Sequence, residues 1–417
     1  MSNHYDLIII GGGASGVLAA LGARKAGLTG PLAVFEKESQ PLRKVLASGN
    51  GRCNIASLAP VAGHYQGDDP SFVGPVFEAF PADKLLAILR EIGLMTREER
   101  ENRVYPRSFQ ARSVTLLLLN ALRNTKVDLI YPLKISEVKK QKNLFLAGAD
   151  NGGLATARAV LVAAGSCASP DLGGSRAGYE ILQALGHRLN EPVPSLVPLT
   201  LSPHPLIRHA EGVRFRGSVL FKGRSGVTAR TEGEYLITKY GLSGIAAMEL
   251  GGAAGRSVSP AAGAGTIEID FLPELDEEAI GQILMAADVA DGDWRIALAG
   301  LVPDKIARAL VSCAAAQDQV FSSRSLMVAE LSRKLKQLEI SVTGTRGFQY
   351  AQVAAGGMAT ADFNPATLMS RLVPGLFACG ELLDVDGDTG GFNLMWAMAS
   401  GYLAGQSAAL YLESQPS

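Results

Sequence analysis

The feature that most constrains this chain is a glycine pattern close to its N-terminus. Gly11, Gly13 and Gly16 form GxGxxG directly after the β-branched run at 5–10, and the next segment, 14–26, has helical composition with small residues on one side. A strand that ends in a glycine turn and leads straight into a helix is the first half of a βαβ unit. The pattern therefore predicts a parallel sheet at the N-terminus.

Each glycine in this turn has a separate physical task. Gly11 permits the tight turn, Gly13 lets a phosphate group approach the backbone, and Gly16 lets helix and strand pack closely. The helix N-terminus behind them presents free N–H groups and the positive end of the helix dipole. The turn is thus suited to a pyrophosphate.

The residues that follow complete the unit. A second strand is expected at 32–35, and Glu36 closes it, twenty residues after Gly16. An acidic side chain at this distance accepts hydrogen bonds from the hydroxyls of an adenosine ribose. Together these features predict a dinucleotide-binding domain.

The C-terminal region indicates which dinucleotide is bound. Continuous apolar runs at 159–164 and 375–378 stop at glycine, as strands buried on both faces do. After the second run, 380–391 is rich in glycine and acidic residues and precedes a helix of small residues, which gives a second helix N-terminus. Two positive helix ends in one site suit FAD better than a nicotinamide cofactor, with backbone N–H groups around Gly391 and Phe392 facing the flavin pyrimidine oxygen.

A third cluster lies at 44–54, with the sequence KVLASGNGRCN. Glycine, serine and asparagine beside two cations make a loop that can wrap phosphate and ring edges, although spacing alone only suggests this. Cys53 has no second thiol near it in sequence, so a packing role beside the cofactor is favoured over disulfide chemistry.

The middle of the chain differs from both ends in composition and in hydrophobic pattern. Five prolines fall within fourteen residues from Pro192, which is typical of a boundary. Two-residue alternation at 213–221 and 267–271 then suggests exposed antiparallel strands, and three helices are expected at 276–288, 303–315 and 325–338. We predict an inserted domain at 192–345, a small β unit plus helices, within a discontinuous cofactor domain made of 1–191 and 346–417.

Composition excludes several classes of protein. The chain has 39 Lys and Arg against 40 Asp and Glu, which leaves no global basic field and argues against nucleic acid as the main partner. The four cysteines form no CxxC or Cys/His cluster, so we expect no metal site and a reducing, cytoplasmic location. The apolar stretches at 7–23 and 394–412 are interpreted as a glycine-interrupted βα unit and a buried helix, and no membrane partner is expected.

Several segments together resemble the YhiN/BaiN-like flavoproteins, a family that includes aminoacetone oxidase. The main matches are GGGASG at 11–16, RKVLASGNGRCN at 43–54 and GELLDVDGDTGGFNL at 380–394. Further matches are RVYP at 103–106, PVPSLVPL at 192–199, YGLSG at 240–244 and NPATLMS at 364–370. The resemblance spans nearly the whole chain.

This family resemblance implies an α/β fold with an FAD-binding, Rossmann-like domain of the glutathione-reductase type. The domain is assembled from both chain ends, and an inserted domain covers the isoalloxazine. Gly11–Gly16 and Glu36 are then expected at the ADP half, Glu381 at the ribityl hydroxyls and Gly391–Leu394 at the ring. The full set of expected cofactor-binding residues is Gly11, Gly13, Ala14, Ser15, Gly16, Glu36, Lys37, Lys44, Ser48, Gly51, Arg52, Cys53, Asn54, Ala164, Gly165, Gly380, Glu381, Asp388, Gly391, Phe392, Asn393 and Leu394.

The resemblance says less about the substrate. Lys239 and Tyr240 are the candidate catalytic residues, because the family places this segment over the cleft. Lys239 stands where relatives commonly carry His, Ile245 replaces a usual Pro, and Ala354 stands where Thr is common. Inheritance of a relative's specificity is therefore doubtful if these positions touch the substrate.

The sequence predicts an FAD-dependent oxidoreductase in which hydride moves between a small organic substrate and flavin N5. No residue lies in a recognised covalent-attachment motif, so FAD is expected to be bound non-covalently. Two directions stay open, an amine or alcohol oxidase and a reductase of an activated double bond. No second strand, GxGxxG and helix unit occurs at 150–345, so the electrons are expected to come from the substrate itself or from NAD(P)H that binds transiently at the flavin. The alternative from another class is a flavin-containing protein that modifies or binds RNA.

Overall fold

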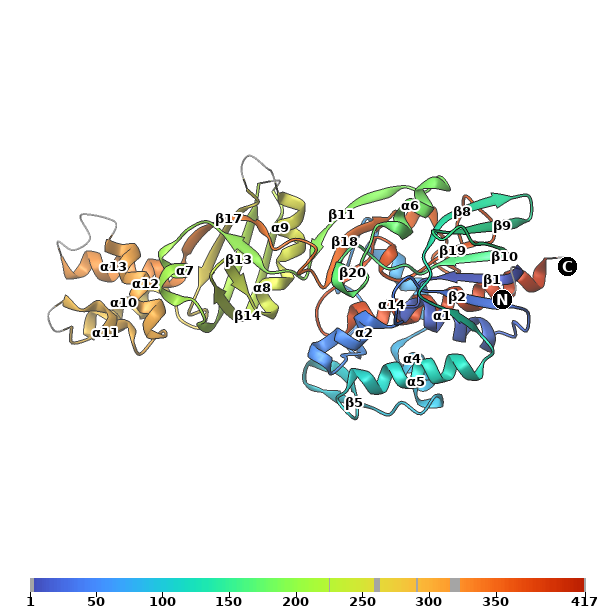
Figure 1. The fold of residues 1–417 in the computed structure, drawn as a ribbon. Coiled ribbons are helices and arrows are strands. Elements are labelled where there is room, and N and C mark those ends of the chain that lie inside the picture. Colours follow the sequence, from blue (N-terminus) through green and yellow to red (C-terminus); the bar gives the residue numbers. More distant parts are fainter. Residues whose placement is uncertain (1–3, 225, 259–262, 290–291, 316–322, 416–417) are drawn as a thin grey trace. The chain divides into compact units, whose positions relative to one another are not determined.

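The computed structural model describes residues 4–224, 226–258, 263–289, 292–315 and 323–415. The chain forms two compact units (Figure 1). Unit 1 comprises Met1–Pro192 and Val353–Ser417, and unit 2 comprises Val193–Gln352. We propose that each unit acts as one domain.

A mostly parallel sheet of seven strands forms the centre of unit 1. β1 lies between β2 and β10, β7 extends the sheet beyond β2, and these pairings are all parallel. β19 pairs in parallel with the end of β10, whereas β9 and β8 continue as antiparallel strands from its beginning. The strands are β1 (His4–Ile10), β2 (Leu32–Phe35), β7 (Asp128–Ile130), β8 (Ile135–Gln141), β9 (Leu144–Ala149), β10 (Leu154–Val162) and β19 (Leu376–Ala378). The predicted α/β fold is confirmed, and segments from both ends of the chain share this sheet.

Two helices pack closely against each other beside the sheet, α1 (Ala14–Lys25) and α14 (Phe392–Ser414). Glycines permit the contact. A Cβ on Gly405 would lie 1.9 Å from the carbonyl oxygen of Ala19, and one on Gly22 would lie 2.3 Å from that of Tyr402. The small residues at 394–412 therefore serve helix packing, and no helix among the described residues is long and apolar enough to cross a membrane.

The remaining elements of unit 1 are short and surround the sheet. The helices are α2 (Arg43–Ala47), α3 (Val73–Ala79), α4 (Ala82–Glu91), α5 (Ala111–Asn124) and α6 (Ala177–Ala184), with 3-10 turns η1 (Ser48–Gly51), η2 (Pro70–Phe72), η3 (Arg100–Asn102), η4 (Pro170–Leu172), η7 (Thr360–Asp362) and η8 (Gly380–Leu382). The small sheets pair β3 (Ala56–Ser57) with β6 (Arg103–Pro106), β6 with β5 (Thr96–Glu99), β20 (Asp386–Gly387) with β4 (Tyr65–Gln66), and β11 (Leu189–Ser195) with β18 (Val353–Met358).

Unit 2 is built on a closed antiparallel barrel in the strand order β12-β15-β14-β13-β16-β17. Its strands are β12 (Leu199–Leu201), β13 (Arg214–Gly223), β14 (Thr228–Thr238), β15 (Gly241–Ser243), β16 (Gly265–Asp270) and β17 (Leu338–Thr345). The alternating segments predicted from sequence form β13 and β16. One face of these strands is at least partly exposed, as the alternation predicts, whereas Phe215, Val219 and Ile267 on the other face point into a buried core that the closed barrel shares with helices.

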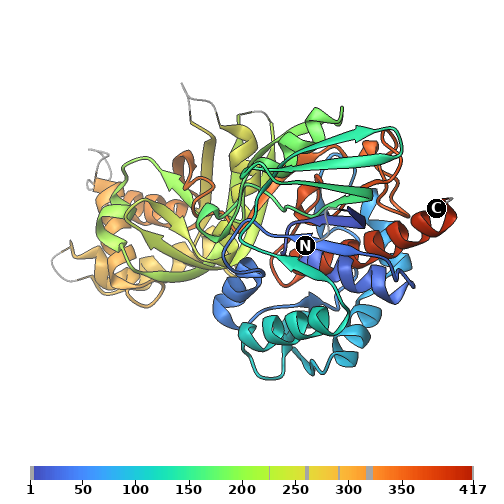
Figure 2. The same ribbon diagram turned by 45° about the vertical axis from the view of Figure 1, so that its right-hand side comes forward.

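The helices coloured orange in Figures 1 and 2 gather at one end of the barrel of unit 2. The three predicted helices are present as α10 (Glu277–Ala286), α12 (Asp304–Ala315) and α13 (Arg324–Lys336). The prediction missed four shorter ones, α7 (Pro205–Ala210), α8 (Ile245–Glu249), α9 (Gly251–Ser257) and α11 (Trp294–Leu298). Helices this short give too few turns for a clear period in the sequence.

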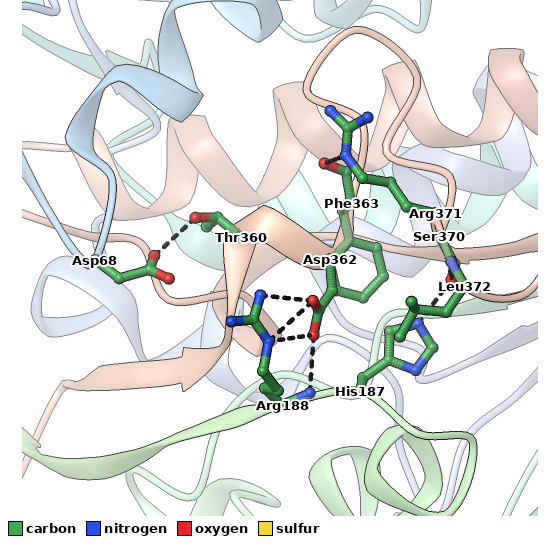
Figure 3. Close-up of polar contacts among 9 residues, drawn as sticks. All are labelled: Asp68, His187, Arg188, Thr360, Asp362, Phe363, Ser370, Arg371 and Leu372. Atoms are coloured by element: carbon green, nitrogen blue, oxygen red, sulfur yellow. Dashed lines mark hydrogen bonds and ion pairs between the residues drawn. The ribbon is translucent and has the colours of Figure 1, made fainter.

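A polar network ties the start of β11 to the segment after β18 (Figure 3). Arg188 donates from its backbone and its guanidinium to Asp362, with the shortest contact at 2.7 Å. The Ser370 hydroxyl accepts two backbone N–H groups and lies 2.7 Å from His187 Nε2, while His187 Nδ1 lies 3.1 Å from the Leu182 carbonyl oxygen. Because a carbonyl can only accept, Nδ1 carries the hydrogen and Nε2 accepts from Ser370. The buried ring is therefore held neutral.

This arrangement predicts how acid affects stability. Burial lowers the pKa of His187 below its ordinary value of 6.5, so the unfolded chain takes up the proton first as pH falls. The stabilising contribution is full above about pH 6.5 and is lost below it. We expect His187→Gln to cost about 1–2 kcal/mol at pH 7.5 and to lessen the fall in melting temperature between pH 7.5 and 5.5. Thermal unfolding at both pH values measures this, and an equal fall in the variant would contradict it.

Candidate cofactor site

The glycine turn after β1 has the geometry that its sequence predicts. Gly11 has a φ of +112°, and a Cβ there would lie 2.3 Å from the carbonyl oxygen of Ala163 at the end of β10. A Cβ on Gly16 would lie 1.9 Å from the carbonyl oxygen of Gly11. These two glycines are thus required by the packing of the protein itself.

Gly13 is different, because a Cβ at this position would meet no atom within 4 Å. Gly13 is the N-cap of α1, with a φ of −78° and a ψ of −172° that any residue can adopt, and no side chain caps the helix. The first turn of a helix leaves N–H groups without intrahelical acceptors. The open space at Gly13 therefore lies against a set of donors, which include the backbones of Ala14 and Ser15, and this suits a phosphate.

Glu36 lies beside this turn at the end of β2. One carboxylate oxygen accepts the Gly12 N–H at 2.7 Å and the other accepts the Glu38 N–H at 2.7 Å. Each oxygen keeps a further lone pair for a ribose hydroxyl. Lys37, by contrast, pairs with Glu38 at 3.5 Å, so its contribution to the cofactor stays a prediction.

We expect Glu36→Ala to raise the FAD dissociation constant about 10- to 100-fold, because removing a charged acceptor of this kind costs about 1–3 kcal/mol. Titration of the apoprotein with FAD, followed by the quenching of flavin fluorescence, measures this. Glu91→Ala, which removes an exposed ion pair with Lys25, is the control. Unchanged affinity in Glu36→Ala would place the adenosine half elsewhere.

Two distant segments meet at an ion pair between Lys44 and Glu381. Lys44 Nζ lies 3.0 Å from Glu381 Oε2, and Oε1 of the same carboxylate accepts the Ala354 N–H at 3.1 Å. Two side chains of α14 fix the backbone of Gly380, because its N–H donates to the Ser400 hydroxyl and its carbonyl oxygen accepts from the Trp396 ring N–H. Lys44 and Glu381 are partly exposed, so their polar atoms stay within reach of a ligand.

The loop at 48–54 follows a left-handed path. Gly49, Asn50, Gly51 and Cys53 all have φ between +55° and +82°, and the Cys53 N–H closes the loop on the Ser48 carbonyl oxygen at 3.0 Å. Burial raises the pKa of the Cys53 thiol to about 11. A thiol of this kind is a poor nucleophile, which favours the predicted packing role.

The start of α14 lies directly against this loop. A Cβ on Gly391 would lie 2.5 Å from the Ala56 carbonyl oxygen and 2.8 Å from Asn54 Oδ1. Asn54 Oδ1 is itself buried without a hydrogen-bond partner among the described residues. Buried polar oxygens are nearly always paired, so this one indicates a missing donor. Ring N–H groups of a flavin are donors of the required kind.

Other expected residues near α14 have structural partners. The Asn393 amide donates to the carbonyl oxygens of Gly387 and Asp388 at 2.7 and 3.1 Å, and it accepts the Gly387 N–H at 2.8 Å. Asn393 therefore holds the turn before the helix, which leaves its backbone N–H and that of Leu394 in the uncapped first turn.

The loop after β10 completes the edge of the sheet. Ala164 and Gly165 follow β10 at the same carboxyl edge at which Gly11 follows β1, because the two strands are parallel. Gly165 has a φ of +69° and open space where a Cβ would stand. Arg52 is exposed, with its guanidinium 5.7 Å from the centre of the Tyr105 ring.

Lys239 and Tyr240 belong to unit 2, in the turn between β14 and β15. Lys239 is exposed. The Arg346 guanidinium lies 4.3 Å from the centre of the Tyr240 ring and 3.5 Å from that of Tyr350, an arrangement that the sequence analysis missed. A catalytic role for Lys239 and Tyr240 stays a prediction.

Sequence reasoning also missed a histidine in unit 1. His64 Nδ1 lies 2.8 Å from Asp388 Oδ2, and the His64 ring stacks on Phe392 with ring centres 4.4 Å apart and planes at 18°. Asp388 was expected to contact the cofactor, but nothing in the local sequence of His64 connects it with a residue 324 positions away.

These features fit FAD. Residues from both ends of the chain give two uncapped helix N-termini, an open glycine position, a fixed carboxylate and an orphaned buried oxygen. No group of three or more His, Cys, Asp or Glu side chains among the described residues could hold a metal ion.

Comparison with known proteins gives a family match over almost the whole chain. The model described as "HI0933-like protein Rossmann domain" matches residues 5–407. A quinol-fumarate reductase solved with menaquinol molecules aligns with 99% of this chain and 72% of its own, at a TM-score of 0.51 and 16% identity, which shows the fold alone.

Two kinds of relative are similar along their full length. The 3-dehydro-bile acid delta(4,6)-reductase of Clostridium scindens is 37% identical over 412 residues, which cover 96% of this chain and 98% of the relative. The ribosomal RNA dihydrouridine synthase of Haemophilus influenzae is 27% identical over 409 residues, again 96% of this chain and 98% of the relative.

Proposed function

The chain belongs to the HI0933-like flavoprotein family, as its YhiN/BaiN-like motifs predict, and we propose that it is a reductase of carbon–carbon double bonds conjugated to a carbonyl group in a small organic molecule. The family makes it an FAD-dependent oxidoreductase. The direction of the reaction and the class of substrate are the proposal.

The observation that carries the proposal is the 37% identity, over 96% of the chain, with a delta(4,6)-reductase. The double bonds in that relative's name are conjugated to the 3-oxo group. Dihydrouridine, the product named for the second relative, is likewise a pyrimidine in which a double bond next to a ring carbonyl has been hydrogenated. Both names describe addition of hydride and proton to an activated double bond, which favours reduction over amine or alcohol oxidation.

The electrons would come from a reduced nicotinamide that reacts at the same flavin. Every strand pairing in the barrel of unit 2 is antiparallel, so the described residues of unit 2 contain no second parallel βαβ unit for a resident NAD(P)H. NADH or NADPH would then bind transiently and leave before the substrate is reduced.

Action on RNA is the second candidate, because relatives at 27% identity are ribosomal RNA dihydrouridine synthases. The charge balance of the chain argues against action on RNA. Residues 193–352 carry 16 Lys and Arg against 17 Asp and Glu, and residues 1–192 with 353–417 carry 23 of each. Neither part has the basic excess with which proteins hold a phosphate backbone.

A two-stage experiment tests the proposal. The purified protein is reduced anaerobically with NADH or NADPH, freed of excess nicotinamide, and mixed with a 3-oxo-4,6-diene steroid or 2-cyclohexenone. Return of the oxidised flavin spectrum together with a saturated product supports the proposal. Reduction of the oxidised protein by amines or alcohols, with no reaction of the reduced protein with any enone, would overturn it.

The RNA candidate is separated by a parallel measurement. Dihydrouridine is quantified by mass spectrometry in ribosomal RNA after incubation with the reduced protein. We expect none, and RNA that co-purifies at low salt is expected to be lost at high salt. Formation of dihydrouridine at one site would establish the RNA candidate instead.

A further inference from the structure

We propose that His64, oriented by Asp388, is the acid that protonates the substrate in this reaction. The inference rests on the proposed function, because it concerns the proton that a double-bond reduction needs. Nothing in the local sequence or in the relatives' names assigns a role to His64.

The pair has a defined hydrogen-bond pattern. Asp388 Oδ2 accepts from His64 Nδ1 at 2.8 Å, and the Asp388 backbone N–H donates to the His64 carbonyl oxygen at 3.0 Å. The carboxylate fixes which ring nitrogen keeps its hydrogen, so Nε2 is the nitrogen that gains and loses a proton. Nε2 has no hydrogen-bond partner among the described residues.

The ring of His64 lies against Phe392, the first residue of α14. It stacks on Phe392, whose carbonyl oxygen accepts the buried Tyr65 hydroxyl at 2.9 Å. Strands β4 and β20 bring His64 and Asp388 together, since Asp386 pairs with Gln66 and Gly387 with Tyr65. His64 thus lies on a rigid support beside Gly391–Leu394, the residues expected to face the flavin ring.

The surroundings of His64 suit a proton donor that regains its proton from water. The side chains of His64 and Asp388 are 37% and 42% exposed. Charged or titratable groups on the elements around the pair include Tyr65 and Asp386, which are buried, and Arg103, whose Nε would lie 3.8 Å from a Cβ on Gly390. A protonated His64 therefore has one carboxylate partner and access to water.

The other histidines are placed for different roles. Both ring nitrogens of His187 are engaged in the buried network, and His4 Nδ1 is hydrogen-bonded to the Thr156 hydroxyl in an exposed position. His204 and His209 belong to unit 2, where His204 caps α7. Of the five histidines, His64 is the one whose ring stacks on Phe392 at the start of α14.

With His64 as the acid, atoms and electrons balance in the reduction of the conjugated double bond. Reduced FAD, when bound, would supply the hydride that forms a C–H bond at the carbon β to the carbonyl. The π electrons then move to the carbonyl as an enolate, and His64 Nε2 gives a proton that forms the second C–H bond at the α carbon. His64 regains its proton from water, and the reduced nicotinamide restores the two electrons. General acids of this kind typically contribute about 10²- to 10⁴-fold in rate.

The first test measures the oxidation of the reduced protein by 2-cyclohexenone in an anaerobic stopped-flow instrument. We expect His64→Gln to slow this step about 10²- to 10⁴-fold and Asp388→Asn to slow it less. His4→Gln is the matched control and should react normally.

The second test does not depend on activity. In protein labelled with ¹⁵N-histidine, the neutral His64 ring should carry its hydrogen on Nδ1, and Asp388→Asn should abolish this preference. A ring with its hydrogen on Nε2 in the wild type, or an unchanged rate in His64→Gln, would overturn the role of His64 alone. A wild-type protein that reacts with no enone would overturn the proposed function and this role with it.

Discussion

The Gly13→Ala variant is expected to fold like the wild type and to bind FAD about 100- to 1,000-fold more weakly. Its backbone angles suit alanine, and its methyl group would enter space that no protein atom occupies within 4 Å. That space lies against the uncapped N-terminus of α1, where a pyrophosphate would accept N–H groups. The methyl group would push the phosphate away from at least two donors at the positive helix end.

The matched variant Gly16→Ala separates this effect from a folding defect. Its Cβ would lie 1.9 Å from the Gly11 carbonyl oxygen, so the turn must distort and the apoprotein should lose about 3 kcal/mol or more of folding free energy. Urea unfolding of both apoproteins and FAD titration of Gly13→Ala provide the comparison. Wild-type FAD affinity in Gly13→Ala would show that the phosphates lie elsewhere, and a large loss of stability would contradict the open space.

The sequence was most informative where neighbouring residues determine the structure. The glycine turn, α1 and β1 lie within residues 4–25, so their pattern is local and readable. Glu36 is placed by contacts at longer range, since its carboxylate accepts N–H groups from Gly12, 24 residues before it, and from Glu38. The family resemblance extended this to Glu381 and Gly391, which the fold brings to Lys44 and Asn54.

Features built from distant residues could not be predicted in this way. Alternation in β13 shows that one face is buried, but it does not show whether the sheet closes, and closure decided that the apolar face is the interior of a barrel. The pairs His64–Asp388 and His187–Ser370 join residues far apart in the chain, and each partner is unremarkable in its own sequence context. Such pairs depend on strand register, which a single sequence does not specify.

The two helix N-termini also explain why both chain ends are needed. α1 begins after Gly13 and α14 begins after Gly391, and neither has a side-chain cap. Glycines at the contact between the two helices hold their axes close. An anionic phosphate and a ring that gains negative charge on reduction are each stabilised by a positive helix end. Separation of the chain ends would therefore remove half of the cofactor site.

Variants in unit 2 should separate use of the flavin from binding of the flavin. We expect Lys239→Ala and Tyr240→Phe to keep wild-type FAD content and to slow substrate-dependent flavin turnover about 10- to 1,000-fold, the usual loss when one donor to a reacting group is removed. The residues that fit FAD all lie in unit 1, so cofactor binding and substrate contacts are independent contributions to the free energy.

The design of these variants follows from the contacts of Tyr240. Tyr240→Phe keeps the ring that lies 4.3 Å from the Arg346 guanidinium and removes only the hydroxyl, so a slow rate would report on that hydroxyl rather than on stacking. Tyr350→Phe, on the other side of the same guanidinium, is the control and should react normally. Anaerobic stopped-flow with the identified substrate gives the rates, and flavin absorbance per chain gives the FAD content. Normal rates in Lys239→Ala and Tyr240→Phe would mean that these two side chains take no part in the chemistry, whereas loss of FAD from these variants would mean that unit 2 helps to bind the cofactor.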